Sequence, residues 1–507
     1  MKKIMTRLLS LVLLGTFIPS FVLAETWDLG KGDITVTATE TSQTVSQVNG
    51  ETKDDPDPVI TSSSGKTNNT VTITAEKNAT ANVTLENVNI DTGTTGGAAI
   101  TTSGEGNVNI ELNGTNTVQS GNTHAGVEKK DNGTLTITDE NKDGSLTATG
   151  GNYGAGIGGG YEGSGSNIAI EGGKVKAIGG THGAGIGGGF GGSGSNIAIE
   201  GGKVEASSVG GGAGIGGGSL GSGSNIAVSG GEVTAQGGVG GAGIGGGQGG
   251  SGSKITISDG KVTATGAGAG AGIGGGYEGS GKGITIEGGE VTAQGDTGGA
   301  GIGGGANGTG SDVTISGDAQ VKVQGGTTGR DWHKGAAIGN GGTPTTDGNE
   351  VSPNTSDLKV GGFIQIYEPG KNINTDTPDR TIEGQKGDHS WNAGEVTTAE
   401  TVPESKAAAY WVSDSQGQSI PYQAQQKDGV LTVTVQADTA SLRGTTGSLG
   451  QLEAQGIAEI RFVTNGAQSA FTLSDLLTSG TGSFTLTHDG DKVTFTLEST
   501  DISGILK

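Results

Sequence analysis

The chain has 507 residues, of which 108 are glycine, none is cysteine and only 4% are aromatic. Its formal net charge of −23 argues against nucleic acid or an anionic membrane as a partner. An exported fold without cysteine must be stable without disulfides. Glycine follows no three-residue register and there are only nine prolines, which excludes collagen.

Residues 1–24 read as a secretory signal peptide. Lys2, Lys3 and Arg7 form the positive start, Leu8 to Leu14 form the apolar core, and Ala24 ends a small-residue cleavage site. The apolar run is too short for a transmembrane segment, and nothing similar recurs later. We therefore expect a secreted, extracellular protein, associated or not with the cell surface. Cleavage would leave 26 basic against 52 acidic groups, a net charge of −26.

A repeat dominates the middle of the chain. The heptapeptide GAGIGGG begins six times at intervals of 29 residues, at Gly154, Gly183, Gly212, Gly241, Gly270 and Gly299. A fixed period in this range indicates supersecondary units that stack on one another. The repeat therefore predicts a solenoid.

Each repeat contains three short strand-like pieces separated by glycine turns, such as those around Ile157, Ile168–Ile170 and Val175. Period-2 alternation places isoleucine and valine on one face, and stacking in register turns them into inward columns. Three parallel sheets with glycine corners describe a right-handed parallel β-helix with 29-residue coils. We expect about nine coils.

The flanks differ from the repeats. Residues 25–68 are expected to form an N-terminal β cap, residues 69–366 the β-helix with its degenerate early coils, and residues 367–404 an irregular linker or cap. Residues 405–507 alternate with period 2, and Asp489-Gly490 predicts a hairpin there. We predict a separate small antiparallel β domain.

The glycine clusters do not predict a nucleotide site, because none is followed by Gly-Lys-Ser/Thr. A calcium-binding nonapeptide array would need aspartate where Asn167, Asn196, Asn225 and Lys254 stand, and only Asp312 fits. We expect no cofactor, and at most an incidental Ca²⁺ on so acidic a surface. Charged side chains recur in every coil, which suits an exposed surface better than a catalytic site. An enzyme, which would be a polysaccharide lyase, is therefore the third hypothesis, after the two non-catalytic ones given below.

Aromatic residues are the candidate binding residues, because aromatic faces beside hydrogen-bonding groups suit sugar rings. Tyr161, Phe190 and Tyr277 share one column after the GIGGG corner. Trp332 with Asp331 and His333, and Trp391 with His389, lie in irregular stretches near the end of the solenoid. The alternative interpretations are that the Tyr161 column shields a glycine-rich corner of the backbone and that the two tryptophans cap the end of the solenoid.

The repeat GAGIGGG…GSGSNIAIEGGKV, opened by ETWDLGKGDITVTA after the signal peptide, resembles glycine-rich exported proteins of gut clostridia. These are similar to a family of carbohydrate-binding β-helix proteins with a polysaccharide-lyase-like fold, which bind cellulose or pectin without cleaving them. The resemblance covers about residues 25–366. It implies a polysaccharide or surface glycan as partner, but no family binding residue can be placed on this sequence.

The leading hypothesis is an extracellular, non-catalytic carbohydrate-binding or adhesin-like protein. The alternative is a structural spacer or matrix protein that displays residues 405–507 to a protein partner.

Overall fold

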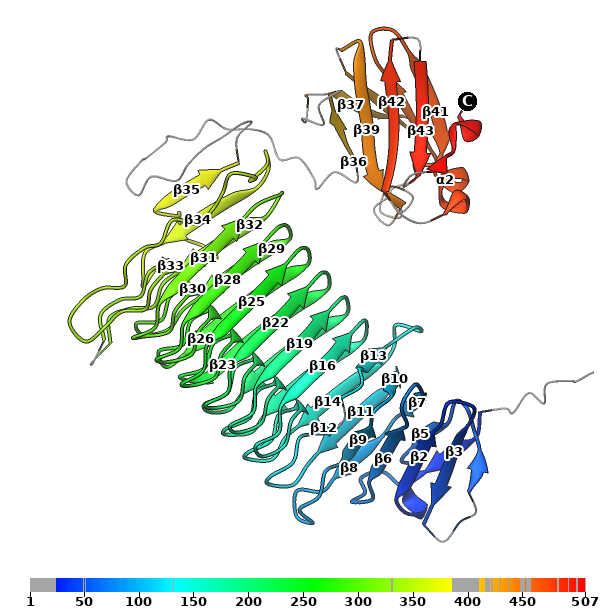
Figure 1. The fold of residues 1–507 in the computed structure, drawn as a ribbon, viewed down its shortest axis with the longest axis vertical. Coiled ribbons are helices and arrows are strands. Elements are labelled where there is room, and N and C mark those ends of the chain that lie inside the picture. Colours follow the sequence, from blue (N-terminus) through cyan, green and yellow to red (C-terminus); the bar gives the residue numbers. More distant parts are fainter. Residues whose placement is uncertain are drawn as a thin grey trace, which may run out of the picture. The chain divides into compact units, whose positions relative to one another are not determined.

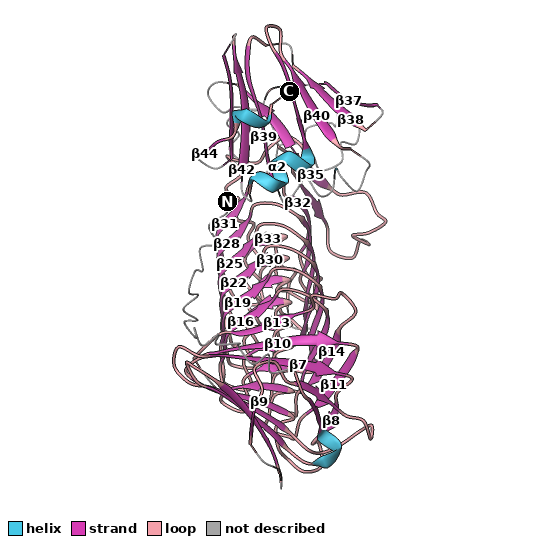
Figure 2. Ribbon diagram, turned by 90° about the vertical axis from the view of Figure 1, so that its right-hand side faces the viewer, coloured by secondary structure: helices cyan, strands magenta, loops and turns pink. Residues whose placement is uncertain are grey.

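The computed structural model describes residues 24–384 except 49, 51, 131, 330 and 331. It also describes residues 410–414, 420, 423–427, 429–435, 437–446, 452, 457–480, 483–490, 492–497 and 500–506. The chain divides into two compact units, Met1–Thr398 and Ala399–Lys507. The first is a parallel β-solenoid, whose strands stack as successive layers in Figures 1 and 2, and the second is a small β domain.

The first sheet of the solenoid has eleven strands, each paired in parallel with the strand of the next coil. They are β1 (Thr26–Asp28), β5 (Val59–Thr61), β7 (Thr80–Glu86), β10 (Asn107–Asn113), β13 (Leu135–Thr138), β16 (Gly165–Ile170), β19 (Gly194–Ile199), β22 (Gly223–Val228), β25 (Gly252–Ile257), β28 (Gly281–Ile286) and β31 (Gly310–Ile315). A 3₁₀ turn, η1 (Leu29–Lys31), follows β1.

The second sheet has thirteen strands, and those of the regular coils are only two residues long. Its parallel strands are β2 (Ile34–Ala38), β6 (Val71–Ala75), β9 (Ile100–Gly104), β12 (Val127–Lys129), β15 (Ile157–Gly158), β18 (Ile186–Gly187), β21 (Ile215–Gly216), β24 (Ile244–Gly245), β27 (Ile273–Gly274), β30 (Ile302–Gly303) and β33 (Ile338–Gly339). At the N-terminal end β3 (Gln43–Gln47) and β4 (Lys53–Asp54) continue it in antiparallel fashion.

The third sheet has eleven strands. They are β8 (Asn89–Asp91), β11 (Thr115–Gln119), β14 (Ser145–Thr149), β17 (Lys174–Gly179), β20 (Lys203–Ser208), β23 (Glu232–Val239), β26 (Lys261–Ala267), β29 (Glu290–Gln294), β32 (Gln320–Gln324), β34 (Phe363–Tyr367) and β35 (Arg380–Glu383). All pair in parallel except β35, which runs antiparallel to β34 and covers the end of the sheet.

The inward columns that the repeat predicts are the core of the solenoid. Ile157 pairs with Ile186 and Val175 with Val204, and the same pairing continues coil after coil. These side chains are at most 1% exposed. Period-2 alternation, applied to 29-residue repeats, thus gives the correct register and the correct inner face.

The solenoid starts earlier than the repeats suggest. β1, β5 and β2 all lie within residues 25–68, and they pair in parallel with the coil that follows. Residues 25–68 therefore contain a first coil as well as the covering β3–β4 segment. Two of the three sheets contain eleven parallel strands, more layers than the nine coils expected, because the early coils lack the glycine heptapeptide.

The C-terminal end of the solenoid is closed by residues 340–384. In the stack, backbone N–H groups of one coil donate to carbonyls of the next, so the last coil needs other acceptors. Glu350 supplies them to the second sheet, accepting from Ala337 N at 2.8 Å and Ile338 N at 3.2 Å. Burial raises the pKa of Glu350, and these two hydrogen bonds oppose that rise. Ile315 N likewise donates to Asn354 O, which covers the first sheet.

The second unit contains two sheets. One is antiparallel and consists of β36 (Tyr410–Ser413), β39 (Thr439–Thr445), β42 (Ser483–Asp489), β43 (Lys492–Leu497) and β44 (Thr500–Asp501). The other consists of β37 (Gln423–Lys427), β38 (Val430–Thr434), β40 (Glu459–Val463) and β41 (Gln468–Thr472), and here β38 and β40 run parallel. The helix α2 (Leu473–Ser479) and the turn η2 (Ser503–Ile505) complete the unit.

This unit has its own core. Phe471, Phe484 and Phe495 are fully buried, with ring centroids 4.7 to 6.2 Å apart. The predicted hairpin is present, since β42 and β43 pair on either side of Gly490, whose φ is 59°. The stretch from Phe471 to Leu477, which fits a strand or a helical turn by sequence, ends β41 and then begins α2 at the cap residue Thr472.

A substitution at Gly216, in the two-residue strand β21 of the second sheet, can test how closely the coils stack. A Cβ on Gly216, whose φ is 135°, would lie 2.0 Å from the carbonyl oxygen of Gly245 in the next coil. We expect Gly216→Ala to destabilise the solenoid by more than about 3 kcal/mol, since backbone must move. Gly191→Asn is the matched control, because a Cβ on Gly191 would meet only the Glu162 Cγ, at 3.9 Å, and Asn307 has the equivalent position with φ 64°. Thermal unfolding followed by circular dichroism measures both; equal effects would contradict the close-contact explanation.

A second test concerns His488, which is fully buried between Thr464 and Ser469 and lies 4.8 Å from the ring of Phe462. Burial lowers the pKa of His488. The unfolded chain therefore takes up a proton near the ordinary histidine pKa of about 6.5 while the folded domain does not. We expect stability of the C-terminal domain to fall as pH decreases from about 7 to about 5.5, by up to about 1.4 kcal/mol per pH unit.

The measurement is calorimetry of the full chain, with hydrogen exchange assigning the transition to residues 457–497. His488→Gln should flatten the pH dependence of that transition and leave the solenoid transition unchanged. A variant that keeps the wild-type slope would show that another group is responsible.

Candidate functional site

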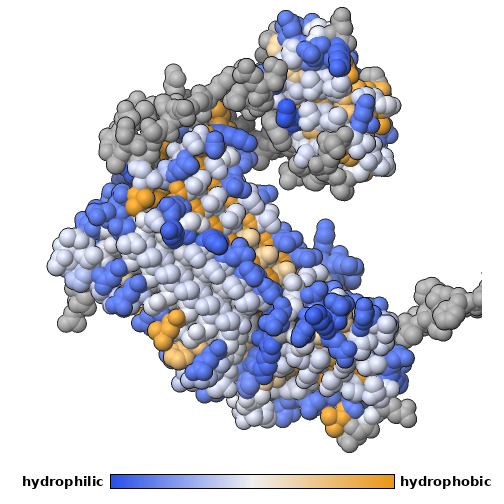
Figure 3. All heavy atoms as spheres, viewed as in Figure 1, coloured by the Kyte–Doolittle hydropathy of each residue, from blue (hydrophilic) through white to orange (hydrophobic). Residues whose placement is uncertain are grey.

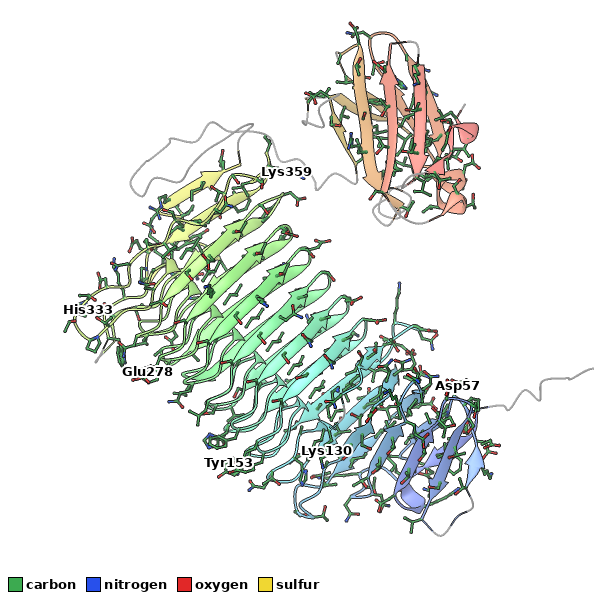
Figure 4. All side chains as sticks on the ribbon, in the orientation of Figure 1. Asp57, Lys130, Tyr153, Glu278, His333 and Lys359 are labelled. Carbon is green, nitrogen blue, oxygen red and sulfur yellow. The ribbon has the colours of Figure 1, made fainter. Side chains whose placement is uncertain are left out.

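The candidate site is one edge of the solenoid, where two kinds of turn lie side by side. The turn from the third to the second sheet contains Tyr153 and its equivalents, and the turn from the second to the first contains Tyr161 and its equivalents. Backbone hydrogen bonds join them across neighbouring coils: Phe190 N to Tyr153 O, Ser219 N to His182 O, Gln248 N to Gly211 O, Tyr277 N to Gly240 O and Ala306 N to Ala269 O. We call this surface, which ends at Trp332, the aromatic edge. Figure 4 shows Tyr153, Glu278 and His333 along it.

Four rings form a cluster at its N-terminal end. Tyr153 stacks on His182 with centroids 5.2 Å apart, and Tyr161 stacks on Phe190 at 5.8 Å. The two stacks meet edge to face, with Phe190 5.9 Å from Tyr153 and 5.2 Å from His182. These are favourable aromatic geometries, and each stack follows from the 29-residue spacing of its members. Tyr161 remains 47% exposed.

A second aromatic pair lies further along the same edge. Trp332 and Tyr277 meet edge to face with ring centroids 5.4 Å apart. Trp332 belongs to the insertion that breaks the repeat, and it lies against Gly298, where a Cβ would come within 3.0 Å of the Trp332 Cβ. His333 follows and pairs with Asp347 at 3.1 Å. The insertion therefore folds back onto the column of Tyr277.

Both clusters contain the same tyrosine–glutamate pair. Tyr161 is followed by Glu162 and Tyr277 by Glu278, and each glutamate has a left-handed backbone with φ of 57° and 60°. A hydrogen bond to Glu162 raises the pKa of Tyr161, and a hydrogen bond to Glu278 raises the pKa of Tyr277. In each pair the carboxylate beside the phenol is exposed and can accept hydrogen bonds from a ligand.

Between the two clusters the edge is uncharged and partly apolar. Val209, Leu220 and Val239 are 67%, 62% and 64% exposed. With Tyr161 they are four of the six large apolar side chains that the described residues expose most. Apolar side chains of this edge appear as orange patches on the lower left of the solenoid in Figure 3. The Gln248 side chain lies over Gly240 of the neighbouring turn, with its Cγ 3.1 Å from the position of a Gly240 Cβ.

The structure brings some of the sequence candidates together and not others. Tyr161 contacts Phe190, and Tyr277 contacts Trp332, but three coils separate Phe190 from Tyr277. His333 is near the second pair, while Asp331, His389 and Trp391 lie outside the described residues.

Sequence reasoning missed Tyr153 and His182. Their signal was present, because they are 29 residues apart and each stands eight residues before a member of the Tyr161–Phe190 stack.

A charged cluster on the same side is structural. Glu128 is 3% exposed and accepts from Ala125 N at 3.1 Å, while His124 and Lys130 approach its carboxylate at 2.6 and 2.7 Å. In the regular coils the equivalent Ala155 N donates to Gly159 O. The Glu128 carboxylate therefore replaces a backbone carbonyl, and the Lys130 ammonium pairs with its charge.

The asparagine column at the supposed calcium positions also has a structural role. Asn167, Asn196 and Asn225 have φ between 52° and 56°, which asparagine tolerates better than most residues. Their side-chain amides form a ladder, with Asn196 donating to Asn167 at 2.8 Å and Asn225 to Asn196 at 2.7 Å. Within the described part of the chain, no group of three or more His, Asp or Glu side chains is placed to hold a metal ion.

Comparison with known proteins agrees with the fold. Residues 142–161, 168–190, 197–219, 226–248, 255–277 and 284–306 match a family model described as Beta helix repeat. Neither a curated protein nor a solved structure matches the chain. The resemblance to exported clostridial and polysaccharide-lyase-like proteins is thus supported only as far as the β-helix repeat. Among the described helices, none is long and apolar enough to cross a membrane.

The tyrosine–glutamate pair gives a direct test of the site's geometry. Glu162→Gln should lower the pKa of Tyr161, because the variant removes the carboxylate that holds the phenolic proton and repels a phenolate. Ultraviolet titration of the phenols measures it, with Tyr161→Phe identifying the signal. Glu171→Gln, an exposed carboxylate at a different corner, should leave that titration unchanged. An unchanged Tyr161 titration in Glu162→Gln would show that the pair does not form.

Proposed function

We propose that the protein is an extracellular, non-catalytic carbohydrate-binding or adhesin-like protein that holds polysaccharide on the aromatic edge. The observation that carries the proposal is the gathering of two aromatic clusters on one edge of a rigid solenoid, in a chain that is only 4% aromatic. Aromatic rings contact the C–H faces of sugars, and adjacent carboxylates and amides accept and donate to their hydroxyls. The extracellular location rests on the signal peptide expected in residues 1–24.

The ring faces also fit this role. Within the first cluster the rings cover one another, but Phe190 is followed in its column by Ser219, and His182 by Gly211. These small residues leave the ends of both stacks without an aromatic neighbour in the next coil. A sugar ring could extend the stack there, at the spacing that the coils themselves impose, about 4.8 Å.

The non-catalytic part of the proposal rests on the distribution of charge. Glu128 accepts from the backbone N–H of Ala125 and lies beside His124 and Lys130. The lysine–glutamate pairs of the third sheet, such as Lys203–Glu232, are exposed and recur along the coils. Release of unsaturated sugars from pectin by the purified protein would instead favour a polysaccharide lyase.

The test is retention on a panel of insoluble polysaccharides, including cellulose, xylan, chitin and pectin. The wild type should be retained on at least one of them. Phe190→Ala and Trp332→Ala should each weaken retention about 3- to 10-fold, as expected for the loss of one aromatic contact. Val360→Ala is the control, since Val360 is 70% exposed but lies outside the aromatic edge. Retention on none of the polysaccharides would overturn the proposal.

The alternative function, a spacer for a protein partner, is favoured by the separate core of Ala399–Lys507. A chain lacking residues 399–507 distinguishes the two. Loss of all retention in that chain, with the solenoid still folded by circular dichroism, would favour the spacer.

A further inference from the structure

We infer that the aromatic edge selects a neutral polysaccharide, and that one chain of it lies along the solenoid axis over four coils. The inference rests on the proposed function and adds the class and orientation of the ligand. The inference starts from two equivalent tyrosine–glutamate pairs, Tyr161–Glu162 and Tyr277–Glu278, which lie four repeats apart. With coils stacked about 4.8 Å apart, the pairs are separated by about 19 Å along the axis.

The charge of the edge decides between neutral and acidic ligands. Glu162 and Glu278 are exposed, and among the described residues neither belongs to an ion pair. Asp296 adds a third carboxylate, which accepts from Gly268 N at 2.7 Å. Carboxylates accept hydrogen bonds from sugar hydroxyls but repel the carboxylates of uronic acids, and like charges across an interface are a strong source of discrimination.

The surface between the pairs supports contact along its whole length. Leu220 has φ 69° and is 62% exposed, at a position where other coils have glycine, glutamate or asparagine. A leucine in the left-handed region costs about 1–2 kcal/mol and here gains little burial in return. Its side chain lies over Gly249 of the next coil, with Cδ2 3.2 Å from the position of a Gly249 Cβ. Val209, Val239 and Gln248 are the other uncharged side chains of this part of the edge. Together they form an uncharged strip that fits the C–H faces of a polysaccharide.

Two equivalent contacts joined by one ligand chain make binding depend on length. A sugar that reaches one tyrosine–glutamate pair gains one contact, whereas a chain that spans both gains the second at high effective concentration. Affinity should therefore rise steeply once an oligosaccharide exceeds about 19 Å and level off for longer chains.

The first experiment compares soluble polymers that differ in charge, by affinity electrophoresis of the full chain. Hydroxyethyl cellulose is compared with carboxymethyl cellulose, and galactan with polygalacturonate. We expect at least a 10-fold preference for the neutral polymer at low salt, which the double variant Glu162→Gln, Glu278→Gln reduces. Glu171→Gln is the control with the same charge change elsewhere. Equal binding of neutral and acidic polymers by the wild type would overturn the inference.

The second experiment measures calorimetric affinity for neutral oligosaccharides of increasing length, prepared from the polymer that binds. We expect the rise at about 19 Å to disappear in Tyr277→Ala, which leaves one pair, and Leu220→Gly to weaken only the long oligosaccharides. Glycine stands at the equivalent positions Gly191 and Gly249, so Leu220→Gly should fold. An affinity independent of length would overturn the four-coil arrangement. Failure of all retention on insoluble polysaccharides would instead defeat the proposed function itself.

Discussion

The close approach of successive coils at the glycine corner is the constraint on which the rest of the solenoid depends. At Gly187 and Gly216 a Cβ would stand 2.0 Å from a carbonyl oxygen of the next coil, which no side chain allows. The second sheet can therefore be reduced to two residues per coil and still keep its hydrogen-bond ladder. Because each corner copies the one before it, the coils cannot slip relative to one another. Equivalent residues must stack, whatever their side chains are.

That enforced register is what creates the aromatic edge, the candidate binding surface, on a repetitive scaffold. Tyr153 and His182, or Tyr161 and Phe190, need no special packing to meet, because the backbone already places them one coil apart. A substitution at one repeat position therefore changes one row of the edge and leaves the scaffold as it was. Glu162, Leu220 and Glu278 are variations at one such position, which has a left-handed backbone and holds glycine or asparagine in other coils.

The sequence predicts the parts of the fold that repeat and fails where the repeat fails. The 29-residue period gives the three sheets and the inward columns of Ile157 and Val175, since burial follows directly from alternation. The contact of Trp332 with Tyr277 could not be predicted, because Trp332 belongs to an insertion without a register. Residues 25–68 were predicted to be a cap and not part of the stack, because β1 and β5 lack the glycine heptapeptide. Glu128 shows a further limit: its buried carboxylate accepts from Ala125 N, where a backbone carbonyl accepts in the regular coils, and no sequence pattern indicates that contact.

The two ends of the solenoid are covered in part by segments of the same chain. An open end would offer unpaired backbone groups to a second molecule, and each sheet of a parallel stack has an edge strand at both ends. Here Glu350 accepts from the second sheet, the strand β35 covers the third, and Asn354 accepts from the first. At the other end, β3 and β4 run antiparallel over β2. The side of the solenoid is the other surface open to a ligand, and along the aromatic edge it combines the exposed ring of Tyr161 with the exposed carboxylates of Glu162 and Glu278.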